Sequence, residues 1–114
     1  MDAVDLRDTS SSRTRDGDAM PTIDQVYRQI GEFARRRGVR RVILYGSRAR
    51  GTNGTKSDID IAAEGSRDFR GFEEDVQDHL DSLLVVDLVN LDTCLSEELR
   101  NEIARDGRVI YEEV

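Results

Sequence analysis

The sequence has one cysteine, one histidine and no apolar run long enough to cross a bilayer, and each shortage excludes a class of protein. Because Cys94 has no partner in the chain, neither an intrachain disulfide nor a cysteine-based metal site is expected, and a reducing cytoplasm is the expected location. His79 lies among polar neighbours, so we interpret it as a solvated side chain. The lack of a long apolar run excludes a membrane-spanning protein.

Basic residues are also scarce relative to acidic ones. Lys and Arg number 17 against 24 Asp and Glu, which gives a formal net charge of -7. A protein that binds duplex nucleic acid through its phosphates needs a basic surface, so direct nucleic-acid binding is not expected. An acidic site that recruits a divalent cation is compatible with this balance.

Composition divides the chain into a polar tail and one domain. Residues 1–20 carry almost no apolar side chains, and we predict that they form a disordered N-terminal tail. Residues 21–114 contain the periodic apolar pattern, and a length of 114 residues fits a single domain.

Apolar spacing predicts the elements of this domain. Spacings of three and four residues predict amphipathic helices whose apolar stripes run over residues 23–34, 69–83 and 95–103. Short runs rich in β-forming residues predict strands at residues 42–45, 58–62, 85–89 and 109–111. The order predicts an α/β (α+β) fold, with a small mixed sheet backed by helices on one face and an open acidic face.

The most informative stretch follows the first predicted strand. The apolar run 42–45 ends at Gly46 and Ser47. Glycine lets the backbone turn sharply and approach a polyphosphate, while Ser47 offers an amide and a hydroxyl at the start of a short helix. Arg48 and Arg50 in that helix are candidates for charge-assisted contacts with phosphates. This turn is therefore predicted to bind phosphate.

Three aspartates complete the pattern. Asp58 and Asp60 come ten residues after the turn and alternate with apolar residues, so they share one face of a strand. Asp87 interrupts a later apolar strand, and a lone charge there either faces solvent at a sheet edge or meets a cation. Carboxylates without histidine or cysteine suit Mg²⁺ or Mn²⁺ better than zinc. A pair of such ions stabilises the attacking and leaving oxygens of a phosphoryl displacement.

Residues 42–61, with the strand around Asp87, resemble the signature of the nucleotidyltransferase superfamily that includes DNA polymerase β. Within it, the chain is similar to the minimal nucleotidyltransferases of the MntA type, over about residues 22–112. The resemblance implies a polymerase β-like fold, ATP as substrate and two Mg²⁺ ions bound by Asp58, Asp60 and Asp87. It also implies that Asp87 helps to activate the acceptor hydroxyl, and that Gly46 and Ser47 hold the β and γ phosphates.

A partner chain is also expected, since a domain of this size leaves no room for a dedicated acceptor pocket. Members of the family are commonly encoded beside a small all-helical protein, either a HEPN ribonuclease toxin or a four-helix substrate-binding protein. The resemblance thus implies a hetero-oligomeric antitoxin that transfers AMP to a tyrosine of the toxin. Two alternatives stay open: a non-catalytic antitoxin that occludes its helical partner, and the catalytic subunit of a two-chain enzyme acting on a small molecule.

Overall fold

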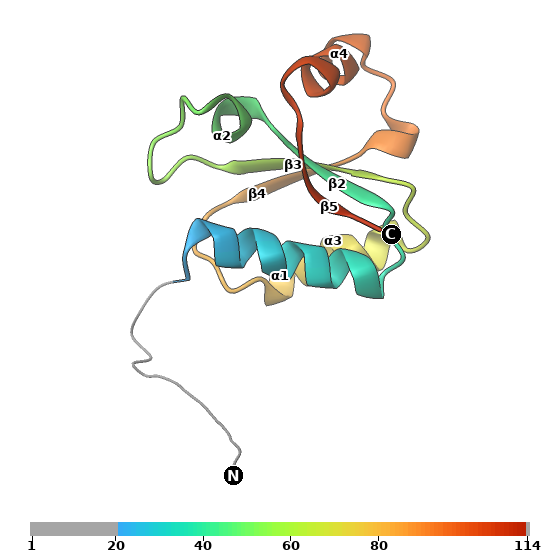
Figure 1. Ribbon diagram of the computed structural model, residues 1–114. Coiled ribbons are helices and arrows are strands. Elements are labelled where there is room, and N and C mark those ends of the chain that lie inside the picture. The colour runs from blue at the N-terminus through green and yellow to red at the C-terminus, as the bar shows by residue number, and fades with distance from the viewer. Residues whose placement is uncertain (1–20, 114) are drawn as a thin grey trace.

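The computed structural model describes residues 21–113, so the predicted tail at residues 1–20 lies outside the described residues. These residues form a four-stranded sheet in the order β4-β3-β2-β5, with helices over both faces (Figure 1). The strands are β2 (Arg41–Tyr45), β3 (Ile59–Glu64), β4 (Val86–Asn90) and β5 (Arg108–Glu112). The helices are α1 (Ile23–Arg36), α2 (Gly46–Arg50), α3 (Phe69–His79) and α4 (Glu97–Asp106), and a 3₁₀ turn, η2 (Leu91–Thr93), follows β4. Within residues 21–113, no helix is long and apolar enough to cross a membrane.

The sheet is mixed, as predicted. Strand β2 runs antiparallel to both β3 and β5, whereas β3 and β4 are parallel. Parallel neighbours need a crossover connection, and α3 supplies it between β3 and β4. This crossover places the two strands that carry the predicted acidic residues side by side.

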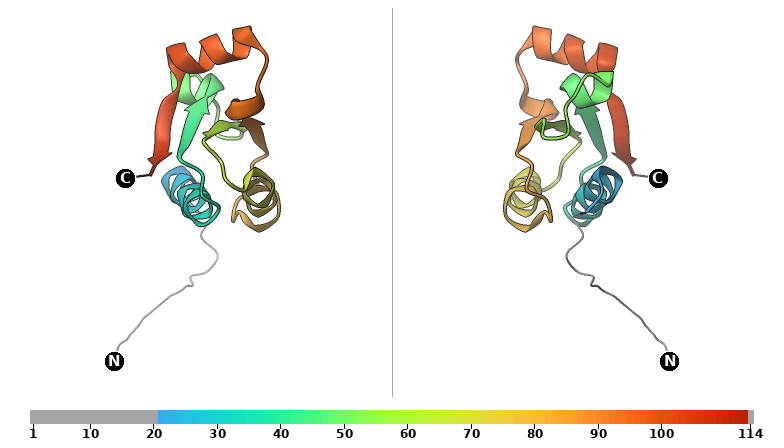
Figure 2. Two further views of the ribbon diagram at one scale, coloured as in Figure 1. Left: turned by 90° about the vertical axis from the view of Figure 1, so that its right-hand side faces the viewer. Right: turned by 90° about the vertical axis from the view of Figure 1, so that its left-hand side faces the viewer.

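The main core lies between the sheet and helices α1 and α3, which run beside each other on one face (Figure 2). Helix α1 begins as the sequence predicts, with a capping box in which the Gln25 amide donates to Thr22 Oγ1 (3.2 Å) and the Thr22 amide donates to Gln25 Oε1 (2.8 Å). Side chains that are fully or almost fully buried in this layer are Ile30, Val39, Val42, Leu44, Ile59, Ile61 and Phe72.

The other face of the sheet differs from the expectation of helices on one face only. Helices α2 and α4 lie over it, above a smaller apolar cluster of Tyr45, Ala62, Leu91 and Ile103 (Figure 1). The reason lies in β2, where Ile43 and Tyr45 alternate with Val42 and Leu44 and so present apolar side chains to both faces. A helix must cover the second set, and α4 does so.

Two predicted helical stripes extend beyond an end of the helix that forms. Helix α3 ends at His79 because Leu80 is extended, and Leu83 beyond it is 85% exposed. Helix α4 begins after Ser96, whose hydroxyl accepts the Leu99 amide (3.2 Å), and Leu95 before it is 97% exposed. The serine cap therefore fixes the helix start more strongly than the apolar spacing does.

An ion-pair junction ties α1 to α3. Arg37, at the end of α1, donates from Nε to Asp75 Oδ2 (2.9 Å) and from Nη1 to Asp68 Oδ2 (3.1 Å). Asp68 also caps α3, since its carboxylate accepts the Gly71 amide (3.0 Å). Asp75 is buried, and the hydrogen bond from Arg37 holds the pKa of its carboxyl below the usual range. The Arg37 guanidinium thus adds a polar link between α1 and α3 to their shared apolar core.

Candidate active site

Strand pairing brings two of the predicted carboxylates together. Asp60 on β3 is in register with Asp87 on β4 on one side and with Tyr45 on β2 on the other. Residues paired in this way on neighbouring strands point to the same face, which here is the face that carries α4. Asp60 is half-buried and Asp87 is exposed, so the pair opens from the sheet toward solvent.

Asp58 stands apart from this pair. It precedes β3 and is exposed. Across residues 21–113, no three acidic, histidine or cysteine side chains are gathered closely enough to form a metal-binding group. The structure therefore brings Asp60 and Asp87 together and leaves Asp58 outside their contact. The charge of Asp58 still acts on the pair, since it helps to raise the pKa of Asp60.

The site gathers negative charge from Asp60 and Asp87. Burial raises the pKa of the Asp60 carboxyl above its ordinary value, and the charge of Asp87 and a hydrogen bond with it raise the pKa further. Smaller contributions come from Asp58 and Glu102. Burial also raises the pKa of Tyr45 to about 12, with the charges of Asp60 and Asp87 adding to the effect. Like charges held this close together favour the binding of a cation.

Gly46 lies against this acidic pair. Its φ of 74° is in the left-handed region, and a Cβ at this position would lie 2.4 Å from Asp60 Oδ2. Two independent constraints therefore favour glycine here, the backbone angle and the close approach of the Asp60 carboxylate. Ser47 follows at the start of α2, is partly buried, and its carbonyl accepts the Thr52 amide (3.0 Å). The structure thus brings the predicted turn and Asp60 into contact.

Arg48 supports the connection between β2 and β3. Its Nη2 donates to the carbonyl oxygens of Ser57 (2.9 Å) and Thr55 (3.2 Å), and its Nε also donates to Ser57 (3.1 Å). The sequence predicted this guanidinium as a phosphate ligand, but in the structure it holds loop carbonyls. Arginine is suited to this because its planar fork reaches several oxygens at once.

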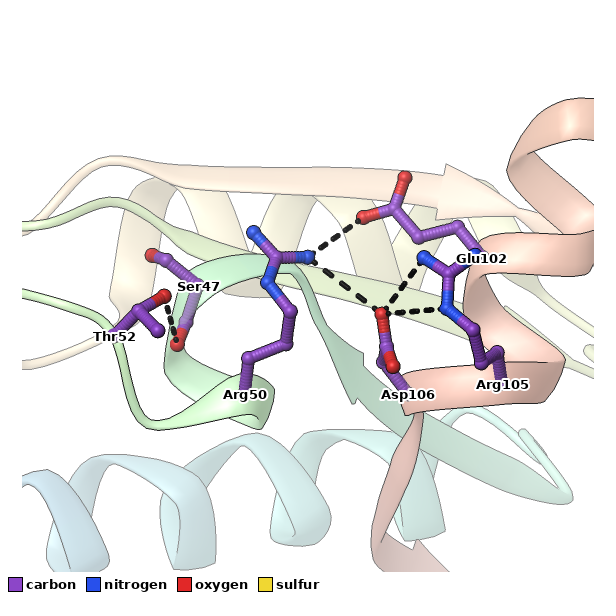
Figure 3. A network of polar contacts seen from close by, with 6 residues as sticks. All are labelled: Ser47, Arg50, Thr52, Glu102, Arg105 and Asp106. Carbon is purple, nitrogen blue, oxygen red and sulfur yellow. Dashed lines mark hydrogen bonds and ion pairs between the residues drawn. The ribbon is translucent and has the colours of Figure 1, made fainter.

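Arg50 links α2 to α4. Its Nη1 lies 3.4 Å from Glu102 Oε2 and 3.7 Å from Asp106 Oδ2 (Figure 3). The side chain predicted to contact phosphate is therefore paired with two carboxylates of α4.

The structure places two further residues, Tyr45 and Glu102, near the acidic pair, and neither is predicted as a site residue from the sequence. Tyr45 lies beside Asp60, and its position follows the alternation of Ile43 and Tyr45 with the core residues of β2, a signal that is readable in the sequence. Glu102 faces the site because α4 packs over the second apolar cluster. Nothing in the sequence around Glu102 distinguishes it from its acidic neighbours.

Comparison with known proteins identifies the fold and the family. The family described as "Polymerase beta, Nucleotidyltransferase" matches residues 28–114, a region that contains Gly46, Ser47 and all three aspartates. No curated protein matches the chain.

Several solved structures are similar. A crystal structure of a toxin–antitoxin with AMP-PNP is 25% identical, covers 76% of this chain and 73% of its own, and has a TM-score of 0.60. A mutant of the MntA–HpeT toxin–antitoxin is 26% identical, with coverages of 75% and 72% and a TM-score of 0.57. An MntA–HepT toxin–antitoxin is 22% identical, with coverages of 77% and 71% and a TM-score of 0.55, and supports the fold alone. These matches confirm the resemblance drawn from residues 42–61. The chain belongs to the polymerase β nucleotidyltransferase family.

Proposed function

We propose that this nucleotidyltransferase moves AMP from ATP to a hydroxyl of a partner protein, a tyrosine of a HEPN-type toxin, and thereby acts as the antitoxin. The observation that carries the proposal is the in-register pair of Asp60 and Asp87 with Gly46 packed against Asp60. The similar structures include toxin–antitoxin pairs, one of them with AMP-PNP, which favours a nucleotide and a toxin as the other participants.

The donor set fits Mg²⁺, with Mn²⁺ as the alternative. Magnesium is commonly held by one or two carboxylates together with waters and substrate phosphates, so the contact of Asp60 with Asp87 provides enough protein ligands. Asp58 would join them once a cation offsets the repulsion among the three charges, and the family chemistry uses two such ions. The metal supplies charge neutralisation for the triphosphate and for the leaving pyrophosphate.

Each residue of the site then has a distinct task. The backbone of Gly46 and Ser47 binds the β and γ phosphates, because the glycine lets the chain approach Asp60 closely. Asp87, the exposed member of the pair, accepts the proton of the acceptor hydroxyl. The acceptor oxygen forms a bond to the α-phosphorus, the bond from that phosphorus to the bridging oxygen breaks, and pyrophosphate leaves.

Exposure of the carboxylates suits an acceptor on a second chain. Asp58 and Asp87 both face solvent, so a hydroxyl carried by a small all-helical partner can approach without any movement of the sheet. The attached nucleotide adds negative charge and bulk to the toxin, which would repel RNA from its active site. The proposed assembly is therefore a hetero-oligomer in which the transferred group itself inactivates the partner.

The test uses ATP labelled at the α-phosphate, Mg²⁺ and the helical protein encoded beside this chain. Label is expected on the partner with the wild-type chain and none with the Asp58→Asn/Asp60→Asn double variant. Asp78→Asn is the matched control, since Asp78 is exposed on α3 across the sheet. Transfer that persists in the double variant would refute the assignment.

The same assay separates the alternatives. Neutralisation of the partner without ATP, and by the double variant, identifies a non-catalytic antitoxin that acts by occlusion. Label found on an added small molecule rather than on the partner identifies the catalytic subunit of a two-chain enzyme.

A further inference from the structure

Arg50 is held loosely by α4. One nitrogen, Nη1, serves both Glu102 Oε2 (3.4 Å) and Asp106 Oδ2 (3.7 Å) (Figure 3). Strong charge-assisted hydrogen bonds are shorter, about 2.7–2.9 Å. The side chains of Arg50 and Glu102 are 42% and 31% exposed, so water screens their attraction. Asp106 is shared further with Arg105, whose Nη2 lies 2.9 Å away.

The same guanidinium retains donors that the protein does not use. In the part of the chain from residue 21 to residue 113, neither Nε nor Nη2 of Arg50 donates a hydrogen bond. Arg50 belongs to the same short helix as Ser47 and follows it by three residues, so the guanidinium starts from the element proposed to bind phosphate. A phosphate group offers two oxygens that match the fork of a guanidinium, a better fit than two carboxylates sharing one nitrogen.

We propose that Glu102 and Asp106 compete with the nucleotide for Arg50. The carboxylates hold the guanidinium in the nucleotide-free protein and release it to the triphosphate when the nucleotide binds. Release removes the contact by which Arg50 ties α2 to α4, so nucleotide binding loosens α4 over the site. The inference rests on the proposed function, because it takes a nucleoside triphosphate as the ligand of the Gly46–Ser47 turn.

The test is an equilibrium titration of the full chain with Mg–ATP and with Mg–tripolyphosphate. Glu102→Gln is expected to bind both ligands about three- to fivefold more tightly, the range set by the usual strength of a partly exposed ion pair. Arg50→Ala is expected to bind both about fivefold or more weakly. Glu97→Gln is the matched control, because Glu97 is exposed on the same helix and makes no contact with Arg50. Its affinity is expected to stay within about twofold of wild type.

A double variant decides the mechanism. In the Arg50→Ala background, Glu102→Gln is expected to leave affinity unchanged, because no guanidinium remains to be released. If Glu102→Gln raises the affinity equally in wild type and in Arg50→Ala, Glu102 repels the triphosphate directly. If the Glu102→Gln single variant binds more weakly than wild type, Glu102 merely positions Arg50 or α4. Either result overturns the proposal. If wild-type protein binds neither ligand, the proposed function itself fails. If Arg50→Ala loses its helical circular dichroism signal and is therefore not folded, Arg50→Gln replaces it in both measurements.

Discussion

The close approach of Gly46 to Asp60 predicts that a single added methyl group, in Gly46→Ala, lowers the rate of nucleotide transfer. Gly46→Ala places a Cβ 2.4 Å from Asp60 Oδ2, and real Cβ atoms essentially never lie closer than 3.0 Å to a non-bonded atom. The carboxylate must therefore move away by several tenths of an ångström. Because it is the end of a flexible side chain, it moves without disrupting the fold. Displacements near 1 Å cost catalysis about 100-fold, so a smaller shift is expected to lower kcat by about 10-fold or more.

Gly51→Ala provides the control for backbone strain. Gly51 has a φ of 79°, close to the 74° of Gly46, but a Cβ there meets nothing within 4 Å. Left-handed backbone costs a residue with a side chain about 1–2 kcal/mol, so both variants lose similar stability. In a domain of this size each kcal/mol lowers Tm by about 4–8 °C.

The assay is calorimetry for Tm together with transfer of labelled AMP to the partner. We expect equal losses of Tm in the two variants and a loss of transfer in Gly46→Ala alone. Two results would refute the reasoning. One is equal transfer by both variants, which would mean that the position of Asp60 does not matter. The other is a much larger loss of Tm in Gly46→Ala, which would mean that Asp60 cannot move aside.

Three further predictions follow from the charges of the structure. Burial and Asp87 raise the pKa of Asp60, so the ionised carboxylate opposes folding and the stability of the metal-free protein falls as pH rises from about 4 through the raised pKa. In calorimetry with EDTA at neutral pH, Asp60→Asn should melt at a higher temperature than wild type, whereas added Mg²⁺ should stabilise wild type only. The hydrogen bond from Arg37 lowers the pKa of Asp75, so its contribution is complete above about pH 4 and is lost as pH falls through the lowered value. Asp75→Asn should cost about 1.5–3 kcal/mol in urea unfolding at pH 7 and progressively less as pH falls below about 4, and a cost that is independent of pH would contradict this. Arg48→Ala should accelerate hydrogen exchange of the amides at residues 54–58, because Arg48 holds the carbonyls of Thr55 and Ser57. Arg50→Ala should leave this exchange unchanged, because Arg50 donates instead to Glu102.

The elements and the family were readable in the sequence because they depend on local patterns. The capping box at Thr22, the alternation in β2 and the turn at Gly46 each follow from residues close to one another in the chain. The register of Asp60 with Asp87 was only implied, since strand pairing depends on the crossover between them.

The arginines show where sequence reasoning ends. A guanidinium one residue after Ser47 and another three residues after it both look suited to phosphate. Within the chain, Arg48 donates to carbonyls across a loop and Arg50 to a carboxylate of α4, at sequence separations of 7 and 9 for Arg48 and 52 for Arg50, and the spacing from Ser47 does not predict these contacts. The alternation in β2 indicates that the second face needs cover, but which helix covers it depends on contacts between segments far apart in the chain.

The parallel pairing of β3 with β4 also orders the events of folding. Strands β2 and β3 are neighbours in the chain and pair antiparallel, so closure of their connection is enough to bring Gly46 to Asp60. Asp87 is joined to them through the longer α3 crossover, and contacts of long sequence separation form slowly. The contact of Gly46 with Asp60, on the side assigned to phosphate, therefore needs closure of a shorter loop than the pairing of Asp87 with Asp60, on the side assigned to the acceptor. We expect a nascent chain to complete its acidic pair together with its main core, because Val86, next to Asp87, belongs to that core.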